Sequence, residues 1–174
     1  GSWQLDDWAG RRSAANKVTL QIKYQTLDER QSLIARLAQY AGASLPDSLM
    51  LSSEQLRQLN QSELIDIGAH TVNHPILARL DDVAAEAEIR ASKAQLEHLL
   101  GESVELFAYP NGKPGNDYLP QHVAQVQRAG FRYALSTSEG VARNRNALFE
   151  VPRLGSWDRT PMRFLARMCL LLAR

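Results

Sequence analysis

Hydrophobic positions repeat along the chain with two different periods, and the alternation of these periods predicts a mixed α/β fold. Helices are expected where apolar residues recur every three to four positions, over 27–41, 81–101, 119–129 and from about residue 160 to the end, with a short helix opening at Ser52. Strands are expected at short apolar runs, at 64–69, 104–108, 131–136 and 148–151. Strands that alternate with helices are typical of parallel βαβ units. The first 25 residues show no clear period.

Several helix ends carry capping signals. Asp28 is expected to cap the helix over 27–41, and Gly42 is expected to end it. The run 52–55 reads Ser-Ser-Glu-Gln, which predicts a capping box. The predicted helix over 81–101 has one apolar stripe, which consists of Val83, Ala87, Ala91 and Ala94. Beside this stripe are Ile89, Leu96 and Leu100.

Composition narrows the class of protein. The 174 residues suit one domain over 1–174, and a net charge of +1 argues against a general nucleic-acid binder. No apolar stretch is long enough for a membrane span. One cysteine excludes a disulfide framework and a multi-cysteine zinc site. The start at Gly1-Ser2, without Met, predicts a processed or expressed fragment.

The charge is unevenly distributed along the chain. Residues 51–107 carry four bases and ten acids, whereas residues 128–174 carry nine arginines and three acids. The two regions could attract each other within one fold, or be solvated surfaces of opposite sign, or mark an anion-binding face.

Two histidines follow the first predicted strand. His70 and His74 are four positions apart, and Pro75 disfavours helical geometry at His74, so the pair is expected on a tight loop. Two imidazoles so placed can chelate one metal ion. Thr71-Val72 excludes the His-Glu start of a zinc protease helix. The alternative is that both rings only cap the strand and satisfy backbone groups.

The second predicted strand leads into the segment 107–112, Phe-Ala-Tyr-Pro-Asn-Gly. Its backbone N–H groups, amide side chain and aromatic ring could form an oxyanion site beside a metal. Taken alone, the segment is equally consistent with an ordinary Pro-Asn-Gly turn.

Taken in order, these segments resemble the polysaccharide deacetylase family, also called the NodB homology domain or carbohydrate esterase family four. The segment 67–75 is similar to its His-[Ser/Thr]-x-x-His-Pro motif, and the helix with Glu88-Ile89 and Ser92-Lys93 to its next element. The segment 107–112 resembles a family branch with Phe-Ala-Tyr-Pro loops. The segments 130–137 and 151–153 resemble later strands, so that the resemblance covers about residues 50–155.

The resemblance implies a (β/α) barrel and hydrolytic removal of acetyl groups from N-acetylated sugars of a poly- or oligosaccharide. It implies a divalent metal, zinc or cobalt, held by one Asp and two His, here His70 and His74. The backbone N–H of Asn111 would hold the oxyanion. The sugar groove would be lined by Tyr109, Pro110, Asp117 and Tyr118.

The chain also departs from the family pattern. No clear hydrophobic-Asp-Asp-Gly strand is present, and Asp6 and Asp7 are weak candidates for the general base. The barrel is therefore expected to be incomplete at its N-terminus, with the base and third metal ligand upstream, and activity to be weak or absent. Ala108 stands where the family has a supporting Arg, and Arg153 where it has a general-acid His.

Other expectations concern the proton donor, the partners and alternative functions. His122 and Asp158 are weak candidates for the proton donor. A homo-oligomer that covers exposed strand edges is one option, and the compartment is open between cytoplasm and periplasm. One alternative is a non-catalytic carbohydrate-binding or assembly module on the same scaffold. Another is an amidohydrolase that acts on a non-sugar substrate.

Overall fold

The computed structural model describes residues 5–44, 46, 48–62, 64–142, 148–155 and 157–173. The chain divides into two compact units, residues 1–50 and residues 51–174. Within the described ranges, none of the helices has both the length and the apolar character needed to cross a lipid bilayer.

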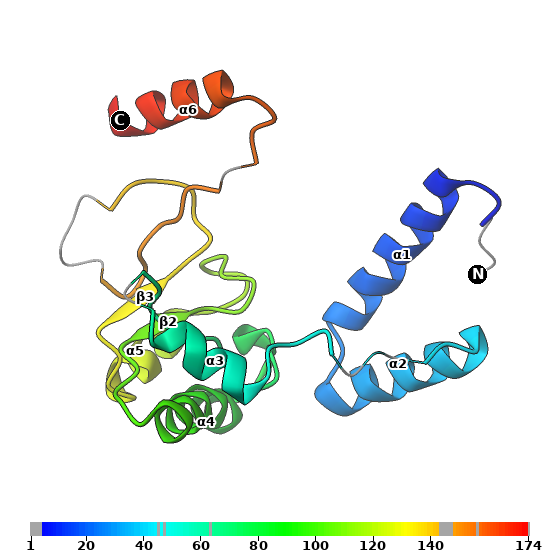
Figure 1. Ribbon diagram of the computed structural model, residues 1–174, viewed down its shortest axis with the longest axis horizontal. Helices are drawn as coiled ribbons and strands as arrows, with labels where there is room; N and C mark the ends of the chain where they lie inside the picture. The colour runs from blue at the N-terminus through cyan, green and yellow to red at the C-terminus, as the bar shows by residue number, and fades with distance from the viewer. Residues whose placement is uncertain are drawn as a thin grey trace. The chain divides into compact units, whose positions relative to one another are not determined.

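The first unit consists of two helices, α1 (Trp8–Lys23) and α2 (Leu27–Ala41) (Figure 1). Helix α1 is absent from the sequence-based prediction because Val18, Leu20 and Ile22 alternate with polar residues, a strand-like period. Asp7 caps it by accepting a hydrogen bond from the Gly10 N–H at 2.7 Å.

Helix α2 has the predicted bounds and ends at Gly42, which adopts a left-handed φ of 57°. The predicted cap is wrong by two residues. Thr26 caps the helix in a capping box with Glu29, and Asp28 lies inside the first turn. A hydroxyl or carboxylate caps only from the residue that precedes the helix, and here that residue is Thr26.

The second unit is built on a three-stranded parallel sheet in the order β1-β2-β3, which confirms the predicted βαβ organisation. The strands are β1 (Gly68–Ala69), β2 (Leu106–Ala108) and β3 (Tyr133–Leu135). The remaining elements are the helices α3 (Ser53–Asn60), η1 (Leu77–Arg79), α4 (Asp82–Leu100), α5 (Pro120–Arg128) and α6 (Pro161–Ala173). Helices α4 and α5 form the crossovers and pack on each other (Figure 1).

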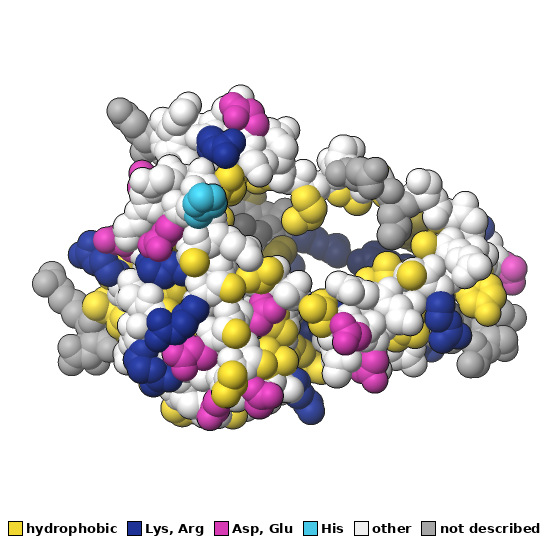
Figure 2. Space-filling view, turned by 90° about the horizontal axis from the view of Figure 1, so that it is seen from below, with side chains coloured by type: hydrophobic (Ala, Val, Ile, Leu, Met, Phe, Trp, Pro, Cys, Tyr) yellow, Lys and Arg dark blue, Asp and Glu magenta, His cyan; other side chains and the backbone are white. Residues whose placement is uncertain are grey.

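The core of this unit lies between the sheet and the two crossover helices. Ile89 of α4 and Val126 of α5 are fully buried together with Phe107 of β2. Aromatic rings fill much of the space, since the Phe107 centroid is 5.1 Å from that of Phe131 and 5.3 Å from that of Tyr109. Figure 2 shows that apolar side chains also reach the surface, between acids and bases.

The strands are shorter than predicted. Leu64 is 93% exposed, and only Gly68–Ala69 of the predicted strand 64–69 pair with β2. Strand β1 is at the edge of the described sheet, so its preceding apolar residues have no second sheet neighbour to cover them. The predicted fourth strand is reduced to one parallel bridge between Leu135 and Val151.

The buried face of α4 also differs from the prediction. Val83 is 81% exposed, and the buried residues are Ala85, Ile89 and Ser92. The i, i+4, i+7 spacing of these three residues is as typical of a helix face as that of the predicted stripe. The small side chains of Ala85 and Ser92 let α4 approach the sheet closely, which hydrophobicity alone does not indicate.

His122 is buried at the start of α5 and is 1% exposed. The Leu119 N–H donates to its Nδ1 at 2.9 Å, so the ring caps the helix and must leave Nδ1 unprotonated. Its Nε2 has no partner among the described residues. This place in the core argues against a role as proton donor.

The cap predicts that acid destabilises the fold through His122. Burial lowers the pKa of His122 below the ordinary 6.5, against a smaller opposing effect of Asp82. The unfolded chain therefore takes up this proton first, and the free energy of unfolding falls as the pH drops below about 6.5. In urea unfolding, the free energy of unfolding should fall less between about pH 7.5 and about pH 5 in His122→Gln than in wild type. The same loss as in wild type would contradict this, and His98→Gln, on the exposed face of α4, is the matched control.

Candidate functional site

Three loops meet at one edge of the sheet. The parallel strands β1, β2 and β3 lead into segments that begin at His70, Tyr109 and Ser136. Carboxyl ends of parallel strands lie on the same edge, which is where functional groups gather in α/β folds. Hydrogen bonds tie these segments together, from the His70 ring to Ala108 and from the hydroxyl and N–H of Thr137 to Asn111 and Gly112.

The two predicted histidines lie against each other at this edge. Their ring centroids are 4.8 Å apart, with an interplanar angle of 71°. Nδ1 of His70 is 2.6 Å from the carbonyl oxygen of Ala108. A carbonyl only accepts, so Nδ1 carries the proton and Nε2 keeps its lone pair. The bond thus satisfies a backbone group, as the alternative interpretation expected, and also prepares the other ring nitrogen as a ligand.

The charge state of His70 also suits a ligand. Loss of water around part of the ring lowers the pKa of His70, and electrostatic interactions with His74 and Arg153 lower it further. The hydrogen bond to Ala108 acts in the opposite direction. The ring is therefore neutral at neutral pH, as metal binding requires.

The loop that carries both histidines is tight and strained. Thr71 and His74 have left-handed φ values of 61° and 52°. Such a conformation is an outlier for a β-branched residue and costs on the order of 1–3 kcal/mol. The Thr71 hydroxyl donates to the His70 carbonyl at 2.6 Å and accepts from the His74 N–H at 3.1 Å. These bonds confirm the predicted tight loop and help to hold its strained backbone.

Glu88 of α4 holds the same loop from the side. Its Oε2 accepts the N–H groups of Val72 and Asn73, both at 2.9 Å, and its Oε1 accepts the Asn73 side-chain amide at 2.6 Å. From the sequence, Glu88 is identified only as part of a motif. A carboxylate on the half-buried side of the helix after the histidines was the available signal.

The second loop presents a backbone N–H at the same edge of the sheet as the histidines. Asn111 and Gly112 have left-handed φ values of 59° and 76°. A Cβ on Gly112 would lie 3.0 Å from both the Tyr109 carbonyl oxygen and Thr137 Cγ2, so the turn requires glycine. Thr137 fixes the turn by donating from its N–H to Gly112 at 2.7 Å and from its hydroxyl to Asn111 at 2.8 Å. In the part of the chain that the structure describes, the Asn111 N–H has no acceptor.

The four predicted groove residues are buried. Tyr109 and Tyr118 stack with centroids 3.8 Å apart, and their hydroxyls donate to the Phe149 carbonyl at 2.9 Å and to Glu150 at 3.0 Å. Burial is the main cause that raises the pKa of both phenols. Pro110 is also buried, and Asp117 accepts the Lys113 N–H at 2.9 Å. Their role in substrate binding stays a prediction, and these side chains serve the packing of the loop.

The remaining predicted site residues make local contacts. Asp7 caps α1 instead of ending a strand, and Asp6 precedes it in the other compact unit. Asp158 pairs with Arg167 of α6, at 3.0 Å from its Nε. No group of three or more metal-ligating side chains occurs among the described residues, so this part of the chain offers the two imidazoles.

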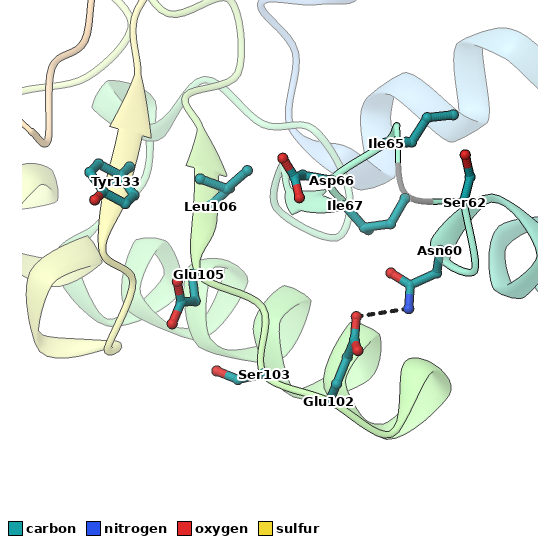
Figure 3. A pocket seen from close by; sticks show the side chains of 10 residues that line it. All are labelled: Asn60, Ser62, Ile65, Asp66, Ile67, Glu102, Ser103, Glu105, Leu106 and Tyr133. Carbon is teal, nitrogen blue, oxygen red and sulfur yellow. Dashed lines mark hydrogen bonds between the residues drawn. The ribbon is translucent and has the colours of Figure 1, made fainter.

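A pocket of about 510 Å³ lies at the other end of the strands and is separate from the histidine site. Figure 3 shows Glu105, Leu106 and Tyr133 at the starts of β2 and β3, and Asn60 bonded to Glu102 at 2.7 Å. None of the residues named above at the carboxyl edge lines it.

The sequence profile of the family described as Polysaccharide deacetylase matches residues 23–134. Among curated protein sequences, none is significantly similar to the chain.

Solved structures resemble the fold. A Streptococcus pyogenes deacetylase in complex with acetate has a TM-score of 0.62 and 24% identity, over 70% of this chain and 51% of that one. A Bacillus cereus polysaccharide deacetylase has a TM-score of 0.58 and 22% identity, over 70% of this chain and 37% of that one. A de-N-acetylase from Aggregatibacter actinomycetemcomitans has a TM-score of 0.59 and 15% identity, over 74% of this chain and 56% of that one. The chain thus spans about half or less of these proteins, and the likeness confirms the predicted type of barrel fold, here with a partial parallel sheet.

The hydrogen bonds that Glu88 accepts from the histidine loop, here called the Glu88 clamp, predict a specific effect of Glu88→Gln. An amide can replace only one carboxylate oxygen as an acceptor, so the loop loses hydrogen bonds. We expect faster hydrogen exchange at the Val72 and Asn73 amides and a fall of about 1–3 kcal/mol in the free energy of unfolding. Glu105→Gln removes an acid of an exposed ion pair with Arg132 and should leave both amides unchanged. Wild-type exchange rates in Glu88→Gln would show that the clamp does not hold the loop.

Proposed function

This chain belongs to the polysaccharide deacetylase family, and we propose that it serves the hydrolysis of acetyl groups from N-acetylated sugars of a poly- or oligosaccharide. The observation that carries the proposal is the pair of imidazoles, whose ring centroids are 4.8 Å apart, with His70 held in the Nδ1–H form by the Ala108 carbonyl. Such a site suits hydrolysis of a carbon–nitrogen, non-peptide bond.

His70 and His74 would hold a divalent cation, zinc or cobalt, because imidazole nitrogen is a preferred ligand of these metals. When bound, such a cation would supply Lewis-acid polarisation of a carbonyl and would acidify water. The fit rests on the neutral His70 ring, whose Nε2 is left without the proton. Because the described residues offer two such ligands, a third one would have to come from elsewhere.

The other residues of the site would position and stabilise the reacting groups. The Asn111 N–H would donate to the acetamide oxygen as it gains negative charge in the transition state, an effect worth about 2.7–4 kcal/mol for one donor. Glu88 and Thr137 would keep the two loops at a fixed spacing. In the overall step, the water oxygen bonds to the acyl carbon, the carbon–nitrogen bond breaks, and the amine leaves with a proton.

We propose weak or absent turnover for this chain by itself, because no carboxylate joins the two histidines among the described residues. The same observation favours a second candidate, a carbohydrate-binding or assembly module without catalysis. Sugar binding without release of acetate would support the module. Acetate release from chitin oligosaccharides that requires added zinc or cobalt would support the deacetylase, and release from small amides alone would support an amidohydrolase.

The proposed ligands predict how metal affinity responds to substitution. Replacing His70 or His74 by Ala removes one of two nitrogen ligands, so each variant should bind Co²⁺ or Zn²⁺ about 10–100-fold more weakly or worse. Calorimetric titration of the chain with each metal gives the affinities. His98→Ala removes an exposed histidine of α4 and should bind like wild type. Equal metal content in wild type, His70→Ala and His74→Ala would overturn the site.

A further inference from the structure

Arg153 is fixed over the carboxyl end of β3, at the edge that carries the histidines. The chain that leads to it pairs with β3, since Val151 bridges to Leu135. Its main-chain N–H donates to the Ser138 carbonyl at 2.9 Å, and its Nε donates to the Ser136 carbonyl at 2.7 Å. Both contacts belong to the segment that contains Thr137, which holds the Asn111–Gly112 turn.

The terminal nitrogens of this guanidinium have no acid within the described residues. Five other arginines pair with carboxylates there, and these are Arg57, Arg90, Arg128, Arg132 and Arg167. The nearest acid in sequence, Glu150, accepts the Tyr118 hydroxyl, and Glu88 is occupied by the histidine loop. Arg153 is close enough to His70 to affect its ionisation, so the edge gathers positive charge.

The chemistry of guanidinium indicates what such a residue can do. Arginine stays protonated in proteins, so Arg153 cannot deliver the proton that a histidine at this place would supply. Its planar amino groups donate in pairs to carboxylates. One of the two products of hydrolysing an acetamide is a carboxylate, and the proposed reaction would form it at this edge of the sheet.

We propose that Arg153 binds the carboxylate of the acetate released by the reaction, through its terminal amino groups. This inference rests on the proposed function for the source of the acetate. Nε stays on the Ser136 carbonyl, which orients the guanidinium, and the remaining donors face the product. Of the interpretations open for the arginine-rich region 128–174, the proposal selects an anion-binding face.

The test is an acetate titration of the isotopically labelled, metal-free chain, followed by NMR. Saturable shifts are expected at the amides of Ser136, Thr137 and Ser138 and at the side-chain nitrogens of Arg153. Charge-assisted hydrogen bonds predict affinity weaker by about 10-fold or more in Arg153→Gln. Arg153→Lys keeps the charge without the paired donors and should be intermediate. Arg132→Gln also removes one positive charge, but Arg132 precedes β3 and so lies at the other end of the strand; this variant should bind acetate like wild type.

Equal acetate affinity in Arg153→Gln and wild type would overturn the proposal, as would identical shifts with chloride at the same ionic strength. If Arg153→Gln does not fold, the wild-type Arg153 nitrogen signals decide, because binding must shift them. Acetate binding that depends on Arg153, with equal metal content in wild type, His70→Ala and His74→Ala, would overturn only the proposed function. Metal-dependent deacetylation with no acetate effect at Arg153 would overturn only this inference.

Discussion

The hydrogen bond between the His70 ring and the Ala108 carbonyl is the contact on which the rest of the site depends. It joins the loops of β1 and β2, and it decides which imidazole nitrogen carries the proton. Because Ala108 ends β2, the register of the sheet sets the position of the ring. The parallel pairing of Ala69 with Phe107 therefore brings His70 to Ala108, and the fold determines the chemistry of the site through one bond.

Backbone strain is concentrated at the same edge. The non-glycine residues with left-handed φ are, in the described ranges, Thr71, His74 and Asn111, and all three lie in the two loops. Each such residue costs on the order of 1–3 kcal/mol and persists only where surrounding contacts hold it. Glu88 supplies those contacts for the first loop and Thr137 for the second. The distribution of strain thus agrees with a site that must present ring nitrogens and an N–H at fixed positions.

Sequence periodicity predicts the helices well because capping residues and apolar spacing are local properties. Helices α2 and α4 have the expected bounds. Helix α1 is not predicted, because the residues around Leu20 have a strand-like pattern. The sequence also indicates the histidine pair, because His70 and His74 are four positions apart and directly follow a predicted strand. The roles of Glu88 and Arg153 depend on contacts between segments distant in sequence, which a single sequence does not reveal. Burial of Tyr109 and Tyr118 was missed for the same reason, since an aromatic loop residue can stack on a ligand or on its neighbour.

Through the Ala108 carbonyl, the sheet holds His70 with the proton on Nδ1 and a lone pair on Nε2. Long-range ¹H–¹⁵N NMR of the imidazole at neutral pH measures this tautomer directly. We expect the Nδ1–H form for His70, with the Nε2 signal shifting when Zn²⁺ is added. An Nε2–H form that zinc leaves unchanged would contradict it.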